Sequence, residues 1–563
     1  MVGGGDRCAA ATSHPVASLA PGRTPVASLA PATYGVAEFT VPAVLDVRAA
    51  EFANRTLMRI DGVDVSFAQM RARSNAAANV LLGLGVSRGD TVALFGGSTP
   101  EWVYFWLGAA RIGAVSAAVN AANKGDYLRH ALAISSAKVV VTDTAERCAR
   151  VLEVAGELDT LQTVLADDPI EAGQSGPAVT STQTLLASAS EANPAGELGF
   201  SPTDTAALFF TSGTTGPSKA VATSWHYLFT AAATVATSWE FAEGESIWSA
   251  MPLFHLSAVA TILAPMLVGG TTVLASVFRP TQVWGELRAS GAVGFVGAGA
   301  MVSMLWNLPA EPRDCELGLR FISAAPIARD LYRAIEQRYA CRVVTMYGLT
   351  EAFPVAVKAV GEEGVPGTSG RINDAFDVAV LDHGDTPVVD AVGEIVCRGR
   401  SSEVMSQGYL EESGTGLRVR PHGEWFRTGD LGRIDASGNL TYCDRVKDAI
   451  RRRGENVSSV EVESVVMGYP GVAEAAAVGV PSELGEEDIL VIVRVAPAAE
   501  LDPRGLLDFC ADRMPYFCVP RYVRLVPELP RNVVGRVRKD LLRATGTGDD
   551  SWDREAHGYV LRR

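Results

Sequence analysis

Apolar residues recur at helical spacing in some segments of the chain and form short continuous runs in others. Residues 66–84 have helical periodicity, and the turn at 88–90 then leads into a short apolar run at 91–95. The alternation continues at 102–113, 139–142, 206–210, 227–236 and 271–275. Alternating helices and strands of this kind predict α/β layers built on largely parallel sheets.

From about residue 374 the pattern changes to short strand-like segments separated by turns. Residues 378–381, 393–397 and 439–442 predict a small β-rich subdomain. After the basic run at 451–453, the remaining stretch of about 100 residues is long enough for a separate domain. It has its own periodicity, helical at 460–467 and 506–513 and strand-like at 472–480 and 488–495.

These patterns together predict an α/β protein with one large and one small domain. The large N-terminal domain is expected at 41–446, with layered α/β subdomains and the β-rich subdomain. A small, mobile α+β C-terminal domain is expected at 447–547. Residues 1–40, which are low in complexity, and residues 548–563, which are polar, are expected to be tails.

The uncharged stretch 256–278 could be mistaken for a membrane span. Pro265 and the pair Gly269-Gly270 fit a buried helix that turns into a buried strand better than a helix in lipid. The first 32 residues also lack the continuous apolar core of a secretory signal. We therefore expect a cytoplasmic protein with no membrane span.

Composition narrows the range of partners. The net charge is −15 with His neutral, and such a surface repels nucleic-acid backbones, so no nucleic-acid partner is expected. A local basic cleft for one small anion is still compatible with this charge. None of the eight cysteines forms a C-x-x-C pair, which is typical of free thiols in a reducing cytoplasm.

The strongest local motif is the segment 211–219, Thr-Ser-Gly-Thr-Thr-Gly-Pro-Ser-Lys, directly after the apolar run at 206–210. Its first six residues contain four hydroxyls and two glycines, whose side chains and backbone N–H groups can wrap phosphates. The segment is not a Walker A loop, because position 218 is Ser. The alternative is a flexible Ser/Thr/Gly surface loop.

Three further segments favour nucleotide chemistry. Residues 347–351, Tyr-Gly-Leu-Thr-Glu, offer an aromatic ring for a base, a hydroxyl for a phosphate and a carboxylate for Mg²⁺. Residues 423–430 end in a carboxylate suited to the two hydroxyls of a ribose, and residues 444–456 place cations beside the expected domain boundary. Each segment alone could also be an ordinary turn or a solvated run of charges.

Together and in this order, these segments resemble the adenylate-forming superfamily, which includes acyl-CoA synthetases, luciferases and the adenylation domains of peptide synthetases. The resemblance extends from about residue 41 to 543 and includes residues 88–90 and 252–256. Within the superfamily, residues 513–522 are most similar to stand-alone acyl-CoA ligases, among them ligases of platensimycin-type diterpenoid biosynthesis.

The resemblance implies a site for ATP and Mg²⁺. Tyr347 would stack on adenine, Thr350 would lie near the α-phosphate, and Glu351 would bind Mg²⁺. Asp430 would bind the ribose, and Arg445 would steady it. The loop that holds the ATP phosphates would consist of Thr211, Ser212, Gly213, Thr214, Thr215, Gly216 and Lys219.

The resemblance also implies a reaction in two halves. A carboxylate attacks the α-phosphate of ATP to give an acyl-adenylate and pyrophosphate, and a thiol then displaces AMP after the small domain swings about a hinge. Lys447 would stand at the hinge, and Gly454 would line the tunnel for the pantetheine arm. His255 would lie between the acyl pocket and the phosphates. Cations near the phosphate favour the first attack, and their withdrawal favours the second.

The chain departs from the family at one catalytic position. The family has a lysine in a Gly-Lys pair that reaches the forming acyl–phosphate bond, and here that position is Arg536. A planar guanidinium does not replace a compact ammonium at a tight site, and losing one such contact typically costs about 100- to 1,000-fold in rate. Alternatively, Arg536 serves in place of the lysine or has no role, or a shifted loop lets Lys539 substitute.

Two function hypotheses follow from this departure. In the first, adenylation is weak or absent, and the enzyme converts an acyl-adenylate supplied by a partner adenylating ligase into acyl-CoA. In the second, the chain is a complete ATP-dependent two-step synthetase. A luciferase-like oxygenase is disfavoured because no segment specifies an oxygen step. A non-catalytic binding protein is disfavoured because the nucleotide motifs are intact.

The nature of the acid is constrained only loosely. No carboxylate follows Phe254 at the place where adenylation domains pair an α-amine, and no carrier domain follows, so we expect free CoA as the acceptor. Small apolar residues in the expected pocket suit a bulky hydrophobic acid. They equally suit tight packing of strands. The pocket residues are Gly297, Gly299, Ala324 and Ala325.

Overall fold

The computed structural model describes residues 30–561, and within that part the chain separates into two compact units. Unit 1 contains the described residues up to 378, with 397–425 and 438–440, and unit 2 contains 379–396, 426–437 and the residues from 441 onward. Each unit is described by itself. The internal positions outside the description are 171–175, 196–200, 212–217, 383, 412–415, 422, 446–447, 449, 453–454, 483–486, 498, 515, 517, 532–535 and 549.

The largest sheet of unit 1 has nine strands, in the order β21-β20-β9-β8-β4-β3-β5-β6-β7. The six strands from β8 to β7 in this order are parallel to their neighbours, and β9 and β20 join antiparallel at one edge. The largely parallel α/β sheet predicted from the sequence is therefore confirmed. The strands are β3 (Thr91–Phe95), β4 (Val115–Val119), β5 (Ala137–Thr142), β6 (Thr163–Ala166), β7 (Ala178–Ser181), β8 (Thr205–Thr211), β9 (Lys219–Ser224), β20 (Gly408–Leu410) and β21 (Leu417–Val419).

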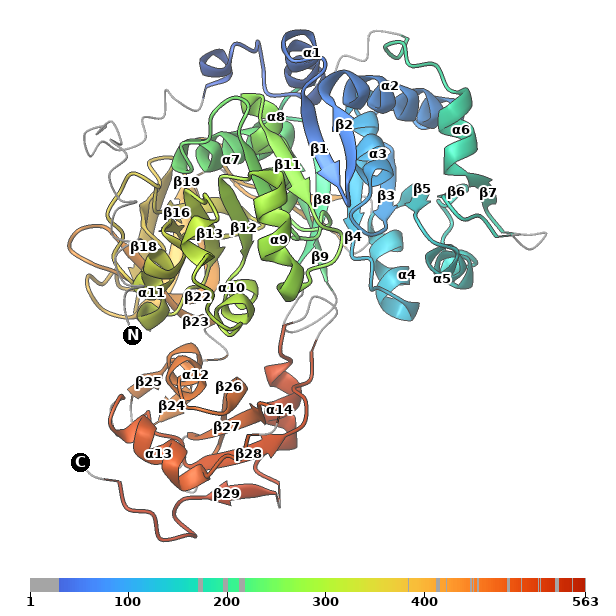
Figure 1. The fold of residues 1–563 in the computed structure, drawn as a ribbon. Coiled ribbons are helices and arrows are strands. Elements are labelled where there is room, and N and C mark those ends of the chain that lie inside the picture. The colour runs from blue at the N-terminus through green and yellow to red at the C-terminus, as the bar shows by residue number, and fades with distance from the viewer. Residues whose placement is uncertain are drawn as a thin grey trace. The chain divides into compact units, whose positions relative to one another are not determined.

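Strand β3 shows why this sheet is buried on both faces (Figure 1). Val92 and Leu94 belong to the core that contains helices α2 (Phe67–Gly83) and α3 (Pro100–Arg111). Ala93 and Phe95 belong to a second core with α4 (Gly125–Ile134) and α5 (Ala145–Ala155). Successive side chains of a strand point to opposite faces, so a continuous apolar run is needed where helices cover both.

Local sequence explains where helix α2 begins and how closely it packs. The Ser66 side chain accepts from the Gln69 N–H, and the Gln69 side chain accepts from the Ser66 N–H, which forms a capping box. The helix predicted at 66–84 is confirmed. A Cβ atom on Gly108 of α3 would lie 2.8 Å from the Cβ atom of Ala77, so glycine is required where the two helices cross.

The second sheet of unit 1 has seven strands, in the order β14-β13-β12-β10-β11-β1-β2, and β15, β16 and β17 form a smaller sheet. These strands are β1 (Thr56–Ile60), β2 (Val63–Ser66), β10 (Ser246–Ser249), β11 (Thr271–Leu274), β12 (Gly294–Ala298), β13 (Phe321–Ala325), β14 (Arg342–Val344), β15 (Met346–Leu349), β16 (Ala352–Val357) and β17 (Arg371–Ile372). The remaining helices of unit 1 are α1 (Val41–Glu51), α6 (Thr182–Ser188), α7 (Trp225–Ser238), α8 (Ala264–Val268), α9 (Pro280–Ser290), α10 (Gly299–Trp306) and α11 (Arg329–Tyr339).

The uncharged stretch at 256–278 forms a buried helix followed by a strand, as predicted. A π-helical segment, Val259–Leu263, continues into α8, and the chain then enters β11. Every residue of the π-helical segment is buried. No helix in the described part of the chain is long and apolar enough to cross a membrane.

The predicted β-rich subdomain corresponds to a four-stranded sheet in the order β18-β19-β22-β23. Unit 2 continues into a second four-stranded sheet, β26-β27-β28-β29, with the two-stranded ribbon β24-β25 preceding it. The strands are β18 (Phe376–Leu381), β19 (Gly393–Gly399), β22 (Phe426–Ile434), β23 (Leu440–Arg445), β24 (Ile450–Arg452), β25 (Glu455–Val457), β26 (Val472–Pro481), β27 (Glu487–Val495), β28 (Tyr522–Val526) and β29 (Ser551–Asp553).

Helices cover both faces of the C-terminal sheet. Residues from α12 (Ser459–Met467) and α13 (Pro503–Ala511) share one core with alternate residues of β27. A residue of α14 (Lys539–Thr545) packs in the other core with the intervening β27 residues. Strand β27 is therefore central and buried on both sides, which explains its apolar run.

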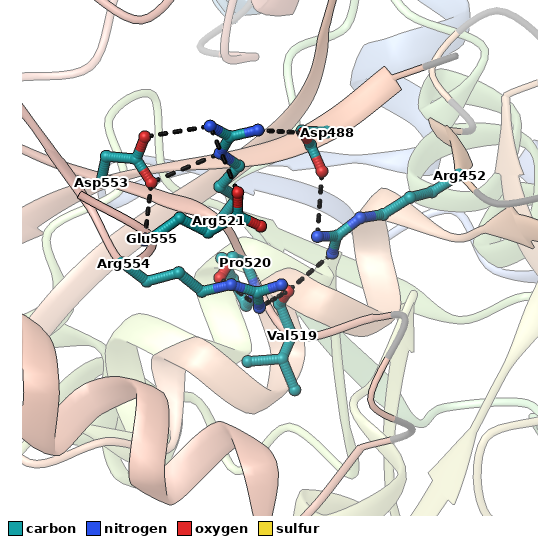
Figure 2. A network of polar contacts seen from close by, with 8 residues as sticks. All are labelled: Arg452, Asp488, Val519, Pro520, Arg521, Asp553, Arg554 and Glu555. Atoms are coloured by element: carbon teal, nitrogen blue, oxygen red, sulfur yellow. Dashed lines mark hydrogen bonds and ion pairs between the residues drawn. The ribbon is translucent and has the colours of Figure 1, made fainter. Parts of the chain in front are cut away.

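A buried ion-pair network joins four segments of unit 2 (Figure 2). The carboxylate of Asp488 in β27 forms ion pairs with Arg452 and Arg521, and each nitrogen–oxygen distance is 3.0 Å. Arg521 also contacts Asp553 of β29 at 3.2 Å, and Arg554 donates to the Val519 carbonyl oxygen. Residues 548–563 were expected to form a tail, but β29 pairs with β28 and this network anchors it.

The N-terminal boundary also differs from the expected one. Residues 1–29 lie outside the described part, and helix α1 begins at Val41 as expected. However, Val36 and Phe39 are already buried, and Phe39 stacks on Phe229 at a centroid distance of 5.7 Å. The folded part of the chain therefore begins before residue 41.

Candidate active site

The two ends of the expected phosphate loop face each other in unit 1. Thr211 is the last residue of β8, Lys219 is the first of β9, and the two are paired across the antiparallel ladder. Both strands are apolar and mostly buried, which fixes the base of the loop. The loop residues Ser212, Gly213, Thr214, Thr215 and Gly216 lie outside the described residues.

The carboxylate of Glu351 is buried between two parts of unit 1. Glu351 lies between β15 and β16, and only 6% of the residue is exposed. The Tyr409 hydroxyl of β20 donates to Glu351 Oε1 at 2.6 Å, and the Ser406 N–H donates to the Glu351 carbonyl oxygen at 2.8 Å. Both the side chain and the backbone of Glu351 are therefore held in place.

Two further candidate residues lie in the same hairpin as Glu351. Tyr347 is buried in β15, and the Thr350 carbonyl oxygen accepts from the Tyr227 hydroxyl at 3.1 Å. Burial, and secondarily the Glu351 carboxylate, raises the pKa of the Tyr227 hydroxyl. Tyr227 therefore remains a hydrogen-bond donor that fixes the backbone next to the proposed metal ligand.

Lys219 contacts an aromatic ring that the sequence motifs did not reveal. Its ammonium lies 5.1 Å from the centroid of the Tyr409 ring, a cation–π distance. Tyr409 stands in a short segment without a recognisable motif, and only the pairing of β20 with β9 brings it to the loop. Tyr409 is thus a candidate site residue that the sequence motifs did not indicate.

The described residues fit Mg²⁺ bound with a nucleotide rather than in a cage of its own. They include no group of three or more His, Cys, Asp and Glu side chains able to hold a metal. Mg²⁺ is commonly held by one or two carboxylates together with substrate phosphates. Glu351, which shares the neighbour Tyr409 with Lys219, would supply the carboxylate in such an arrangement.

His130 of α4 is a second contact to the phosphate loop that the sequence did not predict. Its Nε2 atom lies 2.8 Å from the carbonyl oxygen of Ser218. Because a carbonyl oxygen only accepts, Nε2 carries the hydrogen. The bond ties helix α4 to the residue that precedes Lys219.

Replacing His130 by Phe is expected to weaken ATP binding moderately. One neutral hydrogen bond contributes about 0.5–1.5 kcal/mol, so we expect the KM for ATP to rise by roughly 2- to 10-fold. Steady-state pyrophosphate release at varied ATP concentration measures the change. AMP is the control ligand because it lacks the β- and γ-phosphates, and equal weakening of AMP binding would contradict this role for the contact.

The expected acyl pocket is not resolved by the geometry of unit 1. The ladder of β12 and β13 places Gly297 opposite Ala324, but a Cβ atom on Gly297 would lie 2.7 Å from the Phe295 ring, and Ala324 is buried in the same core as Phe295. A Cβ atom on Gly299 would lie 1.9 Å from the carbonyl oxygen of Pro326. Gly299 therefore permits a close backbone approach and adds no pocket volume. Ala325, at the end of β13, is exposed.

His255 lies in unit 1, six residues after the end of β10. Its ring and that of Phe254 are 4.7 Å apart between centroids, and the residue is half-buried. The His255 backbone N–H donates to the Pro252 carbonyl oxygen. This hydrogen bond closes the turn that carries the His255 side chain.

The ribose candidates are paired in unit 2. Arg445 Nε lies 2.9 Å from Asp430 Oδ1, and Asp430 is almost fully buried. Burial and the Asp430 carboxylate raise the pKa of the Tyr442 hydroxyl, and the positive charge of Arg536 partly opposes this shift. Exposed Arg536 therefore lies within electrostatic reach of the same cluster. Lys447 and Gly454 lie outside the described residues.

Lys539 is engaged in a buried network of unit 2. Its ammonium lies 2.7 Å from Glu463 Oε1 and also contacts the Ser459 hydroxyl. Ser459 in turn donates to Asp444 through both its N–H and its hydroxyl, each at 2.6 Å. Of the cations at 536 and 539, only Arg536 is exposed.

Comparison with known proteins gives matches over both units. The family model described as AMP-binding enzyme matches residues 45–410, and the model described as AMP-binding enzyme C-terminal domain matches 461–536. Long-chain-fatty-acid–CoA ligase FadD13 of Mycobacterium tuberculosis (strain ATCC 25618 / H37Rv) is 31% identical over 489 residues, which cover 85% of this chain and 93% of the relative. Crotonobetaine/carnitine–CoA ligase of Salmonella paratyphi B (strain ATCC BAA-1250 / SPB7) is 28% identical over 496 residues, with the same coverage.

Solved structures agree with the observed fold. ATP-bound MatB from Rhodopseudomonas palustris matches with a TM-score of 0.77 and 25% identity over 89% of this chain and 98% of that one. The anthranilate CoA ligase AuaEII in complex with anthranoyl-AMP matches with a TM-score of 0.80 and 23% identity over 90% and 97%, which supports the fold alone. The chain therefore belongs to the AMP-binding enzyme family, with the α/β fold of the adenylate-forming acyl-CoA ligases.

Proposed function

We propose that this protein is an ATP-dependent acyl-CoA ligase that works through an acyl-adenylate. The observation that carries the proposal is the buried Glu351 carboxylate, held near the Lys219 ammonium at the base of the phosphate loop by their shared neighbour Tyr409. A carboxylate and a cation at that place suit the binding of a nucleotide triphosphate with its metal. The family membership supports the same reaction class.

In the first step a substrate carboxylate forms a bond to the α-phosphorus of ATP, and pyrophosphate leaves. In unit 1, Lys219 is proposed to supply positive charge toward the phosphates, and Glu351 would hold Mg²⁺, which would supply Lewis-acid charge. In unit 2, Arg536 is proposed to supply positive charge for the same step. Asp430, paired with Arg445, accepts hydrogen bonds from the ribose hydroxyls. In the second step the CoA sulfur attacks the acyl carbon, the thiol proton is lost, and AMP leaves.

For the substrate we propose a bulky hydrophobic carboxylic acid with free CoA as acceptor. The lack of a carboxylate directly after Phe254 supports an acid without an α-amine, and the name of the relative FadD13 supports a hydrocarbon body. Gly297 and Ala324 are the proposed lining, and Gly299 is excluded by its contact with Pro326. The relatives give no support for a platensimycin-type pathway, so no pathway is proposed.

The test is release of pyrophosphate and formation of acyl-CoA from ATP, CoA, Mg²⁺ and a panel of carboxylic acids that ranges from acetate to polycyclic acids. We expect both products with at least one large apolar acid and neither product without ATP. If no acid yields pyrophosphate and a synthetic acyl-adenylate yields no thioester with CoA, the proposal is wrong.

A second candidate function rests on Arg536. If the guanidinium supports adenylation poorly, the first step is slow, and the enzyme chiefly transfers the acyl group of an acyl-adenylate made by a partner ligase to CoA. The ion pair between Lys539 and Glu463 supports this candidate, because it leaves no exposed lysine beside Arg536 in the described residues. Supplying a preformed acyl-adenylate separates this candidate from the first one.

A further inference from the structure

Tyr409 touches two groups of the proposed nucleotide site at once. Strand β20 pairs with β9 so that Tyr409 is opposite Val221, two residues after Lys219. Side chains two residues apart lie on one face of a strand, and a diagonal neighbour is within reach of an aromatic ring. This register explains why the Lys219 ammonium lies over the Tyr409 ring, 5.1 Å from its centroid.

The hydroxyl end of the same side chain reaches Glu351, which is 58 residues away in sequence. The O–H···O distance of 2.6 Å lies in the range of charge-assisted hydrogen bonds to a carboxylate. An ionised carboxylate only accepts hydrogen bonds, so the Tyr409 hydroxyl is the donor. A carboxylate has about four acceptor positions, and this bond uses one of them.

The segment around Tyr409 also holds the backbone of Glu351. The Ser406 N–H donates to the Glu351 carbonyl oxygen at 2.8 Å, and Arg420 donates to the Ser406 hydroxyl at 3.1 Å. Residues 406–409 therefore fix Glu351 at both its main chain and its side chain. The backbone contact comes from Ser406, whereas the side-chain contact comes from Tyr409, which also touches Lys219.

We propose that Tyr409 is a positioning residue for the adenylation step. Its hydroxyl orients the Glu351 carboxylate, and its ring places the Lys219 ammonium, so one side chain sets the spacing of the negative and positive groups that receive the nucleotide phosphates and their metal. The inference rests on the proposed function and deepens it. Tyr409 itself does not touch the reacting atoms.

The central test is the Tyr409→Phe variant of the full-length protein, which keeps the ring and loses the hydroxyl. A hydrogen bond to a charged group contributes about 1.5–3 kcal/mol, so we expect MgATP to bind roughly 10- to 100-fold more weakly by calorimetry. Binding of AMP without Mg²⁺ is expected to stay within about 2-fold of wild type, because Glu351 acts through the metal.

Two additional readouts separate positioning from general stability. Glu351→Gln should weaken MgATP binding much less in the Tyr409→Phe background than in wild type, because the two residues act as one unit. Tyr409→Leu removes the ring as well, so its affinity for MgATP should fall by a further 2- to 5-fold, about the size of an exposed cation–π contact.

Tyr332→Phe is the matched control. Its hydroxyl donates to the Val343 carbonyl oxygen at 3.1 Å, in the buried core of the same unit. We expect it to lower the melting temperature without changing MgATP affinity. Wild-type affinity of Tyr409→Phe for MgATP would overturn the positioning role alone. A wild-type protein that binds no MgATP would overturn the proposed function and this inference with it.

Discussion

Under the second candidate function, in which Arg536 supports adenylation poorly, the Arg536→Lys variant is expected to release pyrophosphate about 100- to 1,000-fold faster than wild type, the typical size of one well-placed electrostatic contact in a transition state. The guanidinium is a wide planar fork, whereas an ammonium is a compact charge that fits between a carboxylate and a phosphate. Arg536 is exposed, and its charge acts on the cluster around Tyr442 in unit 2.

The measurement is continuous pyrophosphate release with saturating ATP and the best acid of the panel. Arg538→Lys, the same exchange two residues further on, is the control and should change nothing, because Arg538 is bound to Asp540 at the surface. Conversion of a supplied acyl-adenylate to acyl-CoA should be equal in wild type and Arg536→Lys. If wild type already releases pyrophosphate as fast as the variant, Arg536 performs the role of lysine and the chain is an ordinary two-step ligase.

The Asp488→Ala variant is expected to destabilise the C-terminal part of unit 2 by about 3–5 kcal/mol, the usual cost of removing one partner from a buried ion pair. Asp488 is buried, and both Arg452 and Arg521 direct their guanidinium groups at it (Figure 2). Removing the carboxylate leaves two positive charges close together, with Arg452 itself fully buried.

Hydrogen exchange of peptides from residues 441–561 of the full-length protein is the appropriate measurement, because a chain with two units need not unfold in one step. We expect faster exchange in β27, β28 and β29, with exchange in unit 1 unchanged. Asp550→Ala is the control, because its ion pair with Arg524 leaves the Asp550 side chain 67% exposed. If Asp488→Ala speeds hydrogen exchange no more than Asp550→Ala does, the network contributes little to the stability of this part.

Patterns confined to neighbouring residues were read correctly from the sequence. The α/β alternation, helix α2 and the uncharged helix-to-strand segment all depend on local periodicity and capping. The motif at 347–351 indicated Glu351 as a candidate, and its metal-binding role stays a prediction, although the structure shows that the residue is buried. Tyr409 could not be found in this way, because its partners Glu351 and Lys219 are distant in sequence and meet it only through strand pairing.

Some predictions were wrong because the segments are too short, or too biased in composition, to show a periodic pattern of apolar residues. Strand β29 has three residues with one apolar side chain, Trp552, so nothing in its sequence distinguishes it from a polar tail. Phe39 follows a low-complexity stretch but is buried. Gly299 fits a pocket and a close backbone contact equally well by composition, and only the position of the Pro326 carbonyl oxygen decides between them.

The burial of the cysteines affects the fate of the intermediate. Of the six free cysteines in the described part, only Cys518 is not buried. Burial raises the pKa of the Cys510 thiol to about 12 and that of Cys341 further, so these groups do not form thiolates, the form that attacks electrophiles. A mixed anhydride would acylate an accessible thiolate on the enzyme itself. In the proposed reaction, burial of five of the six free thiols in the described part would limit transfer of the acyl group to the enzyme instead of CoA.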